Sequence, residues 1–178
     1  MTRSMNAARL RVGRCVFAPA LAVAALLAGC AASGWNPGRL AAGEPRERVV
    51  AEMGPPSATH ALAGGGARLE YSHQPAGRQT FMVDLDAAGR VTQWQQVLDE
   101  RHFGLLRVGM AREDVLRELG APSERGRYPL PAPAESWIYR YETRDRCQIF
   151  QVSFGIASGR TLDAGEYIVD PRCAMSAD

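Results

Sequence analysis

Two segments of this 178-residue chain repeat each other, and this repeat constrains the fold more than any other feature of the sequence. Residues 40–57 align without gaps with residues 106–123, and about half of the aligned positions are identical. A period near 66 residues is too long for a solenoid repeat, whose units span about 20–50 residues. The repeat therefore predicts that a small structural unit has been duplicated.

Each copy is expected to begin with a short helix. In the second copy Val115, Leu116 and Leu119 form one apolar stripe at helical spacing, and the first copy has matching residues. Gly120 stands where a left-handed residue ends a helix, and Pro122 prevents its continuation. A variable loop follows. Alternating apolar and polar residues then predict strands near residues 69–74, 81–85 and 91–98, and near residues 137–142, 150–154 and 161–169.

The predicted fold class is therefore α+β, with two tandem units. Each unit is expected to be a short helical segment packed on a three-stranded antiparallel β-meander. A single unit of about 65 residues buries little surface, so the two units are expected to share contacts. We place the first, degenerate unit at residues 40–102 and the second at residues 103–178.

The first 29 residues have the composition of a secretory signal peptide. Four arginines and no acid precede an apolar run at residues 16–27, which is too short to cross a bilayer as a helix. The run ends in Leu-Ala-Gly-Cys at residues 27–30, which resembles the lipobox read by bacterial lipoprotein signal peptidase. We expect residues 1–29 to be cleaved, Cys30 to carry the lipid, and residues 30–39 to form a lipidated tether. The alternative is an ordinary signal peptide with a chance cysteine.

Removal of the signal peptide would change the charge of the protein. The whole chain has a formal net charge of +2, and loss of four arginines leaves the mature form near −2. A mature chain that is not basic has no electrostatic basis for binding nucleic acid. Nucleic acid is therefore not an expected partner.

Two cysteines remain in the mature body, Cys147 and Cys173. Cys147 opens a predicted strand, and the next strand runs back antiparallel to end near Val169, beside that start. An even pair of cysteines in an exported protein favours a disulfide. We predict a Cys147–Cys173 bridge that holds the C-terminal tail, with two independent thiols as the alternative.

The chain has few candidates for catalysis or metal binding. Its histidines lack the spacing of a metal site, its serines after prolines lack a Gly-x-Ser-x-Gly elbow, and its paired acids fall at expected turns. These residues are His60, His73, His102, Ser57, Ser123, and the pairs Asp84 with Asp86 and Asp99 with Glu100. We predict no catalytic residue, no metal ligand and no cofactor, and expect the protein not to be an enzyme.

Two further groups could bind a partner. Several arginines crowd the second unit and could meet phosphate headgroups or an acidic protein surface, although acids are interspersed among them. Trp94 and the tyrosines could form a recognition patch, but core packing is the commoner role. The arginines are Arg125, Arg127, Arg140, Arg144 and Arg146.

The second unit resembles the SmpA/OmlA domain of BamE-like outer-membrane lipoproteins. The residues that carry the resemblance are Phe103-x-x-Leu106-x-Val108-Gly109-Met110, then Val115-x-x-x-Leu119-Gly120-x-Pro122, then Trp137-x-Tyr139. Tandem units of similar design also occur in the secreted β-lactamase inhibitor proteins. The BamE-like resemblance implies a small non-enzymatic module that stabilises the β-barrel assembly machinery and contacts partner proteins and anionic lipid.

The expected function is thus that of an outer-membrane lipoprotein, a scaffold or interaction module for β-barrel assembly or envelope integrity. Ala31, rather than Asp, follows Cys30, and the enteric sorting rule then favours the outer membrane, facing the periplasm. Expected partners are the membrane, through the lipid anchor, and envelope proteins such as assembly components; the sequence does not identify the partner-binding residues. The alternative is an inhibitor-like protein that binds a periplasmic enzyme, with the Pro-rich loop at residues 127–133 inserted. An envelope enzyme is the third hypothesis.

Overall fold

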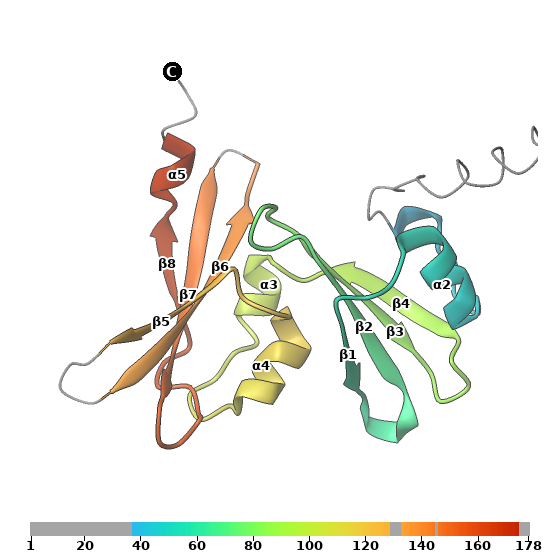
Figure 1. The fold of residues 1–178 in the computed structure, drawn as a ribbon, viewed down its shortest axis with the longest axis horizontal. Helices are drawn as coiled ribbons and strands as arrows, with labels where there is room; N and C mark the ends of the chain where they lie inside the picture. Colours follow the sequence, from blue (N-terminus) through green and yellow to red (C-terminus); the bar gives the residue numbers. More distant parts are fainter. Residues whose placement is uncertain (1–36, 129–132, 145, 175–178) are drawn as a thin grey trace, which may run out of the picture. The chain divides into compact units, whose positions relative to one another are not determined.

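The computed structural model of the chain describes residues 37–128, 133–144 and 146–174 (Figure 1). The predicted signal peptide, most of the predicted tether and the lipidation residue Cys30 lie outside the described residues. Of the tether, the described part is the short 3₁₀ helix η1 (Pro37–Arg39), which leads into the body.

The first half of the body is a four-stranded antiparallel sheet in the order β1-β2-β3-β4. A helix, α2 (Arg46–Met53), precedes it, and a short 3₁₀ helix, η2 (Ala63–Gly65), joins its first two strands. The strands are β1 (Ala58–Ala61), β2 (Ala67–Ser72), β3 (Thr80–Leu85) and β4 (Val91–Gln96).

The second half is another four-stranded antiparallel sheet, in the order β5-β6-β7-β8. Two short helices, α3 (Glu100–Phe103) and α4 (Arg112–Leu119), precede it, and α5 (Pro171–Ala174) follows it. The strands are β5 (Glu124–Tyr128), β6 (Ala134–Glu142), β7 (Cys147–Gly155) and β8 (Glu166–Val169).

The predicted fold class was wrong. The described chain is mostly β, with two four-stranded antiparallel sheets and few short helices, and not an α+β pair of helix-on-meander units with three strands each. The missed strands β1 and β5 occupy the segments that we expected to be loops. Both are edge strands that pair through their backbones with β2 and β6, and neither Ala-Thr-His-Ala nor Glu-Arg-Gly-Arg-Tyr alternates apolar with polar residues.

The aligned sequence segments take the same local conformation. Gly54 ends α2 at φ 80° and ψ −171°, and Gly120 ends α4 at φ 79° and ψ −167°. The hydroxyl of Tyr71 donates to the Gly54 carbonyl at 3.1 Å, and that of Tyr139 donates to the Gly120 carbonyl at the same distance. Each pair of residues therefore ties the end of a helix to the second strand of the sheet that follows it.

Apolar side chains form two core clusters. The first joins Val49 and Met53 of α2 to apolar residues of β2, β3 and β4. The second joins Val115 and Leu119 of α4 to the aromatic residues of β6 and β7, and it also includes Met82 of β3. Strand β3 is buried along its whole length because its two faces contribute to different clusters. Helix α4 therefore shares a core with residues of both sheets.

Polar residues line the contact between the first sheet and the C-terminal end of α4, which we call the seam. Arg68 donates from Nε and Nη2 to the two carboxylate oxygens of Asp84, at 2.6 and 2.9 Å, and from Nη1 to the carbonyl of Arg117 at 2.9 Å. Glu70 accepts a hydrogen bond from the backbone N–H of Ala121 at 2.9 Å. The seam thus supplies a partner to one of the carbonyls that the C-terminal end of a helix leaves unpaired, and to the N–H of the residue that follows its cap.

Candidate binding surface

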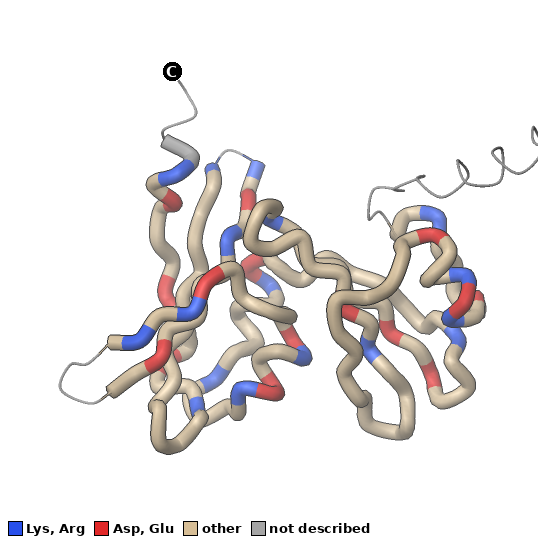
Figure 2. The backbone as a smooth tube through the Cα atoms, in the orientation of Figure 1, with Lys and Arg blue, Asp and Glu red and all other residues tan. Residues whose placement is uncertain are grey.

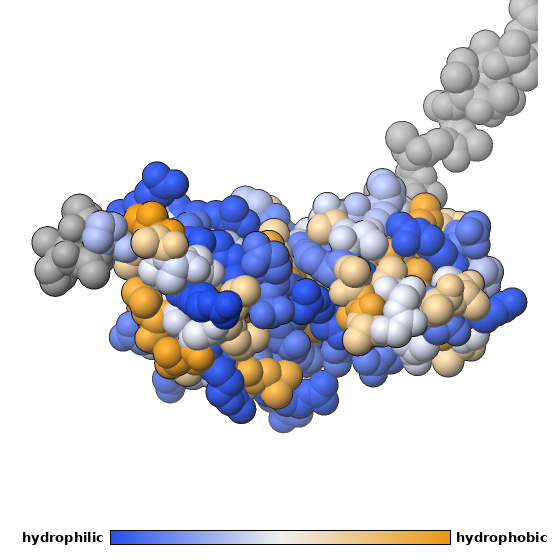
Figure 3. All heavy atoms as spheres, turned by 90° about the horizontal axis from the view of Figure 1, so that it is seen from below, coloured by the Kyte–Doolittle hydropathy of each residue, from blue (hydrophilic) through white to orange (hydrophobic). Residues whose placement is uncertain are grey.

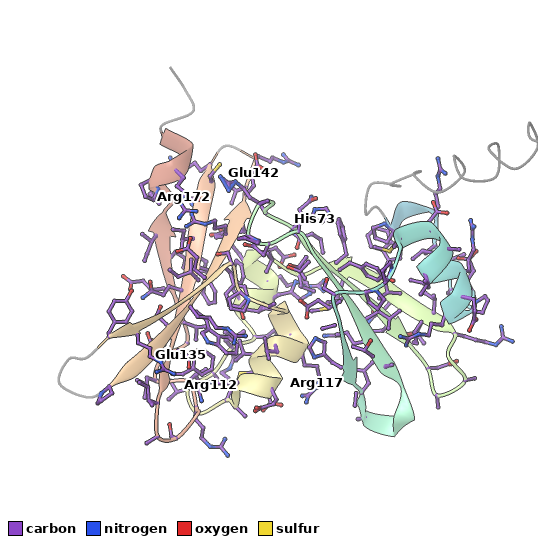
Figure 4. All side chains as sticks on the ribbon, in the orientation of Figure 1. His73, Arg112, Arg117, Glu135, Glu142 and Arg172 are labelled. Carbon is purple, nitrogen blue, oxygen red and sulfur yellow. The ribbon has the colours of Figure 1, made fainter. Side chains whose placement is uncertain are left out.

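A hollow of about 500 Å³ opens between the start of α3 and the turn that joins β6 to β7. We call it the α3 hollow. One of its residues, Glu142, is labelled near the end of β6 in Figure 4. The lining residues are Asp99, Glu100, Arg101, Tyr141, Glu142, Thr143 and Arg144. Its volume lies within the range of ordinary ligand pockets, about 300–1,000 Å³.

Asp99 fixes the α3 side of the hollow. It is the N-cap of α3, and its Oδ1 accepts a hydrogen bond from the backbone N–H of His102 at 2.9 Å. The same oxygen lies 2.7 Å from Nδ1 of His102, whose ring is buried. Arg101 directs its guanidinium to Gln95 of β4, with Nη2 donating to Oε1 at 3.1 Å. Asp99 and Arg101 therefore have structural partners, although both line the hollow.

Tyr141, the aromatic residue that borders the α3 hollow, is buried in a cluster of packed aromatic rings. The ring of Tyr141 packs edge-on against Phe103 at 4.8 Å, and Phe103 stacks on Phe150 at 4.2 Å. Tyr167 of β8 lies 6.4 Å from Tyr141 and is half exposed. Burial, with a smaller contribution from Glu100, raises the pKa of Tyr141 to about 12. At neutral pH this phenol is therefore uncharged, and its hydroxyl donates to the side chain of Gln148.

Exposed apolar side chains lie along the β8 edge of the second sheet. In β8, Tyr167, Ile168 and Val169 are exposed beside one acid, Glu166, whereas the opposite edge strand β5 carries two arginines and a glutamate. Figure 3 shows other apolar side chains exposed among hydrophilic ones. An edge strand with a single charged side chain resists pairing with a partner less than a highly charged edge does.

A second, smaller hollow of about 220 Å³ lies at the start of α4. Its two arginines have structural partners: Arg112 donates to Glu135 at 2.8 Å, and Arg160 donates to the carbonyl of Gly109 at 2.8 Å. Glu135 also accepts from the indole N–H of Trp137 at 2.7 Å. These hydrogen bonds, Trp137 first, lower the pKa of Glu135 despite partial desolvation. Figure 4 labels Arg112 and Glu135, which join α4 to β6.

Of the two cysteines in the predicted disulfide, only Cys147 has a described side chain. Cys147 is disulfide-bonded. Its backbone carbonyl accepts from the N–H of Asp170 at 3.3 Å, so the end of β8 lies beside the start of β7. The side chain of Cys173 lies outside the described side chains, and Cys30 lies outside the described residues. The Cys147–Cys173 pairing and the lipidation of Cys30 stay predictions.

The histidines and serines weighed for chemistry lie at separate places with local partners. His60 of β1 lies 2.8 Å from Glu70, and His102 contacts Asp99. The hydroxyl of Ser123 donates to the carbonyl of Ile138 at 2.7 Å. Within the described ranges, no group of three or more His, Cys, Asp or Glu side chains is placed to hold a metal ion.

One of the paired acids that we expected in solvated turns, Asp84, is buried instead. Asp84 is buried on β3, where it binds Arg68, and only Asp86 lies in the turn that follows. Burial alone would raise the pKa of Asp84, but hydrogen bonds from Arg68 and Gln93 outweigh it and lower the pKa. The sequence indicated this pair of acids. It did not indicate that Arg68 would be buried beside Asp84, whereas Asp86 stays in the exposed turn.

Of the arginines that crowd the second unit, Arg140 is buried within the body. Arg140 is buried, and it donates to Asp170 and to Glu124 at 2.8 Å each. Arg172, labelled in Figure 4, also donates to Glu124 at 2.8 Å. Arg125 lies over the ring of Trp137 at 4.6 Å. Figure 2 shows arginines and acids interspersed along the described chain, so these residues do not form one basic surface.

Sequence reasoning missed the α3 hollow itself. Its two sides, residues 99–101 and 141–144, are about 40 residues apart in the chain, and packing of Phe103 in α3 against Tyr141 in β6 brings them together. The pair Asp99–Glu100 was the only signal, and alone it is equally typical of a helix start.

We expect the stability of the protein to fall in acid because of its buried carboxylates. The folded pKa of Asp84 lies below its ordinary value of 3.8, so its stabilising contribution is complete above that pH and is lost as the pH falls through the folded pKa. Urea unfolding followed between pH 6 and about pH 2 checks this. The variant Asp84→Asn, which cannot titrate, should have a flatter profile; an equally steep profile would contradict the assignment.

Comparisons with known proteins identify no family for this chain. No family model and no curated protein matches it. A solved structure of an extracellular protein containing an SCP domain, from Bacillus anthracis str. Ames, is similar at 15% identity and a TM-score of 0.27. That match covers 75% of this chain and 45% of the other chain. A likeness this low does not extend to the fold, and no functional argument is based on it.

Proposed function

We propose that this chain is a lipid-anchored, non-enzymatic interaction protein of the bacterial outer membrane, linked to β-barrel assembly or envelope integrity. The observation that carries the proposal is a partner surface at one side of the second sheet. There the α3 hollow lies near the exposed edge strand β8, since the ring of Tyr141 beside the hollow is 6.4 Å from that of Tyr167. Hollows and apolar-rich edges of this kind are typical of protein interaction sites.

Two further observations support the proposal. Buried charged side chains of the described part pair within the body, Arg68 with Asp84 and Arg140 with Asp170. The lipobox at residues 27–30 and the BamE-like motif of the second unit favour an envelope lipoprotein. None of the described helices has the length and apolar character needed to cross a membrane.

The proposal is tested by affinity capture from detergent-solubilised envelopes. The lipidated protein is compared with a Cys30→Ala variant, which should lose membrane association because it lacks the acylated thiol. We expect the wild type to sediment with outer membranes and to recover β-barrel assembly components, while the variant remains in the soluble periplasmic fraction.

Capture of one periplasmic enzyme, without assembly components, would contradict this proposal and favour the inhibitor-like alternative. The loop expected for that role begins in β5 at Arg127 and Tyr128, and its residues 129–132 lie outside the described residues. Unchanged membrane association of the Cys30→Ala variant would contradict the lipid anchor.

A further inference from the structure

We propose that a second copy of this chain docks its helix α2 on the second sheet, as α4 docks on the first sheet within one chain. The contact uses the outer face of the second sheet, whose side chains alternate with core aromatics such as Trp137 and Tyr139. The inference goes beyond the proposed function and does not depend on it. The outer face includes Ser136, Ile138, Ile149, Gln151, Ser153 and Ile168.

The strand registers make the two sheets equivalent residue by residue. Tyr71 pairs with Phe81 across β2 and β3, and Tyr139 pairs with Phe150 across β6 and β7. Both tyrosines also donate to the glycine carbonyl that ends the preceding helix. Counting outward from these pairs aligns one face of the first sheet with the outer face of the second. The equivalent pairs are Glu70 and Ile138, Met82 and Gln151, and Asp84 and Ser153.

Residues at these equivalent positions differ in burial. The three on the first sheet are buried on the face that α4 contacts, where Glu70 accepts from the N–H of Ala121 and Met82 shares a core cluster with Leu119. The three on the second sheet are only partly buried, and Ile168 on the same face is 39% exposed. Figure 1 shows α4 against one face of the second sheet, and no helix of similar length among the described elements lies against the other. The cover that α4 gives to the first sheet therefore has no counterpart on the second within the described residues.

Helix α2 exposes the positions through which α4 contacts the first sheet. In α4 these are the carbonyl of Arg117 and, just after the helix, the N–H of Ala121. Their counterparts 66 residues earlier, Ala51 and Pro55, are both exposed. Because α2 packs on one face of the first sheet and α4 on the other, these elements separate α2 from the second sheet of its own chain (Figure 1). The surface on α2 is therefore available to another copy.

The two free surfaces match each other at the point where the seam is polar. In the seam, the N–H of Ala121 requires an acceptor and Glu70 supplies it. The counterparts are Pro55, which has no N–H, and Ile138, which has no acceptor in its side chain. Docking in the geometry of the seam would therefore bury an apolar pair at this point and leave no donor unpaired, a defect that would be costly.

The proposed contact joins two different surfaces. Each copy can bind one neighbour through α2 and another through the outer face of its second sheet. Contacts of this heterologous kind produce head-to-tail chains or rings, whereas a two-fold dimer uses the same surface on both copies. The two kinds of assembly therefore differ in which residues of neighbouring copies meet.

Cysteine cross-linking of the full chain in isolated envelopes tests the contact. The double variant Pro55→Cys/Ile138→Cys places one thiol on each surface, at the counterparts of the Ala121 and Glu70 pair in the seam. After treatment with a short bismaleimide, we expect a ladder of dimers, trimers and larger adducts that the wild-type chain does not give. Each single variant should stay monomeric, and coexpression of the two single variants should give dimers only. Dimers from either single variant alone, or no adducts from the double variant, would overturn the inference.

Further substitutions in the double-cysteine background test each surface separately. Ile168→Glu places a charge on the outer face and Ala51→Arg places one on α2, so each should reduce the ladder at least about tenfold. Leu105→Glu is the matched control, because Leu105 is also exposed but lies between α3 and α4, which pack on the opposite face of the second sheet. Urea unfolding of each variant shows that it is folded, and Ala51 is exposed, so its replacement leaves the body intact. A ladder that survives Ala51→Arg, or that Leu105→Glu reduces as strongly, would show that the contact lies elsewhere.

Discussion

Replacing Arg68 by methionine should destabilise the protein by about 3–5 kcal/mol, the cost of leaving one partner of a buried ion pair alone. Arg68 and Asp84 are both buried, and two hydrogen bonds join them. Methionine fills similar space, so the loss comes mainly from the isolated carboxylate and from the Arg117 carbonyl at the end of α4. Urea unfolding at pH 7, followed by tryptophan fluorescence, measures the effect.

A double variant and a surface control show whether the pairing causes this loss. Arg68→Met/Asp84→Leu removes both charges and should be more stable than Arg68→Met alone, because an apolar pair leaves no buried charge unpaired. Arg48→Met breaks only exposed pairs with Glu44 and Glu52 on α2 and should cost less than about 1 kcal/mol. A double variant that is no more stable than the single one would show that the two charges are not coupled.

Gly120→Ala is expected to be the second most damaging change among these predictions, and Gly54→Ala is its matched control. Both glycines have nearly the same φ and ψ, in a region that side-chain-bearing residues rarely adopt. Strain of this kind costs about 1–3 kcal/mol in each variant. At Gly120 the added Cβ would also lie 2.9 Å from Cδ of Glu70 and 3.0 Å from Cγ2 of Thr80, whereas at Gly54 no atom lies within 4 Å.

The difference between the two alanine variants therefore measures the packing of the seam. Overpacking a filled interior costs about 1–3 kcal/mol, so Gly120→Ala should be less stable than Gly54→Ala by about that amount. Glu70 would have to shift, which would disturb the hydrogen bond that it accepts from Ala121. Free energies of unfolding from urea titrations compare the two variants. Equal losses would mean that the first sheet and α4 are packed loosely enough to separate without cost.

Sequence patterns predicted the elements whose formation depends on neighbouring residues. The 40–57 and 106–123 segments form equivalent helices that end at Gly54 and Gly120, because a residue in this conformation must be glycine. The alternation at residues 81–85 also falls in a strand, β3. The edge strands β1 and β5 were missed because backbone pairing with a neighbouring strand, rather than their side chains, places them in a sheet.

The candidate site could be predicted less well than the fold. The acids Asp99 and Glu100 attracted attention as a pair, but a hollow exists only where the chain folds a second segment, residues 141–144, against them. The alternation of residues 137–142 predicts that Tyr141 faces the core, and Tyr141 is buried. That one side of the same residue lines a hollow depends on the packing of α3, which no local pattern contains.

By itself the sequence determined the repeat, the glycine ends of the two longer helices, and the signal and lipobox motifs that predict export and lipidation. Each of these depends on residues close together in the chain. Only the tertiary structure decided which charged side chains are buried. Asp84 lies in the seam because it pairs with Arg68, 16 residues away, which also binds the carbonyl of Arg117 in α4, 49 residues from Arg68. The free energy of a charge depends on what surrounds it, and those surroundings come from residues distant in the sequence.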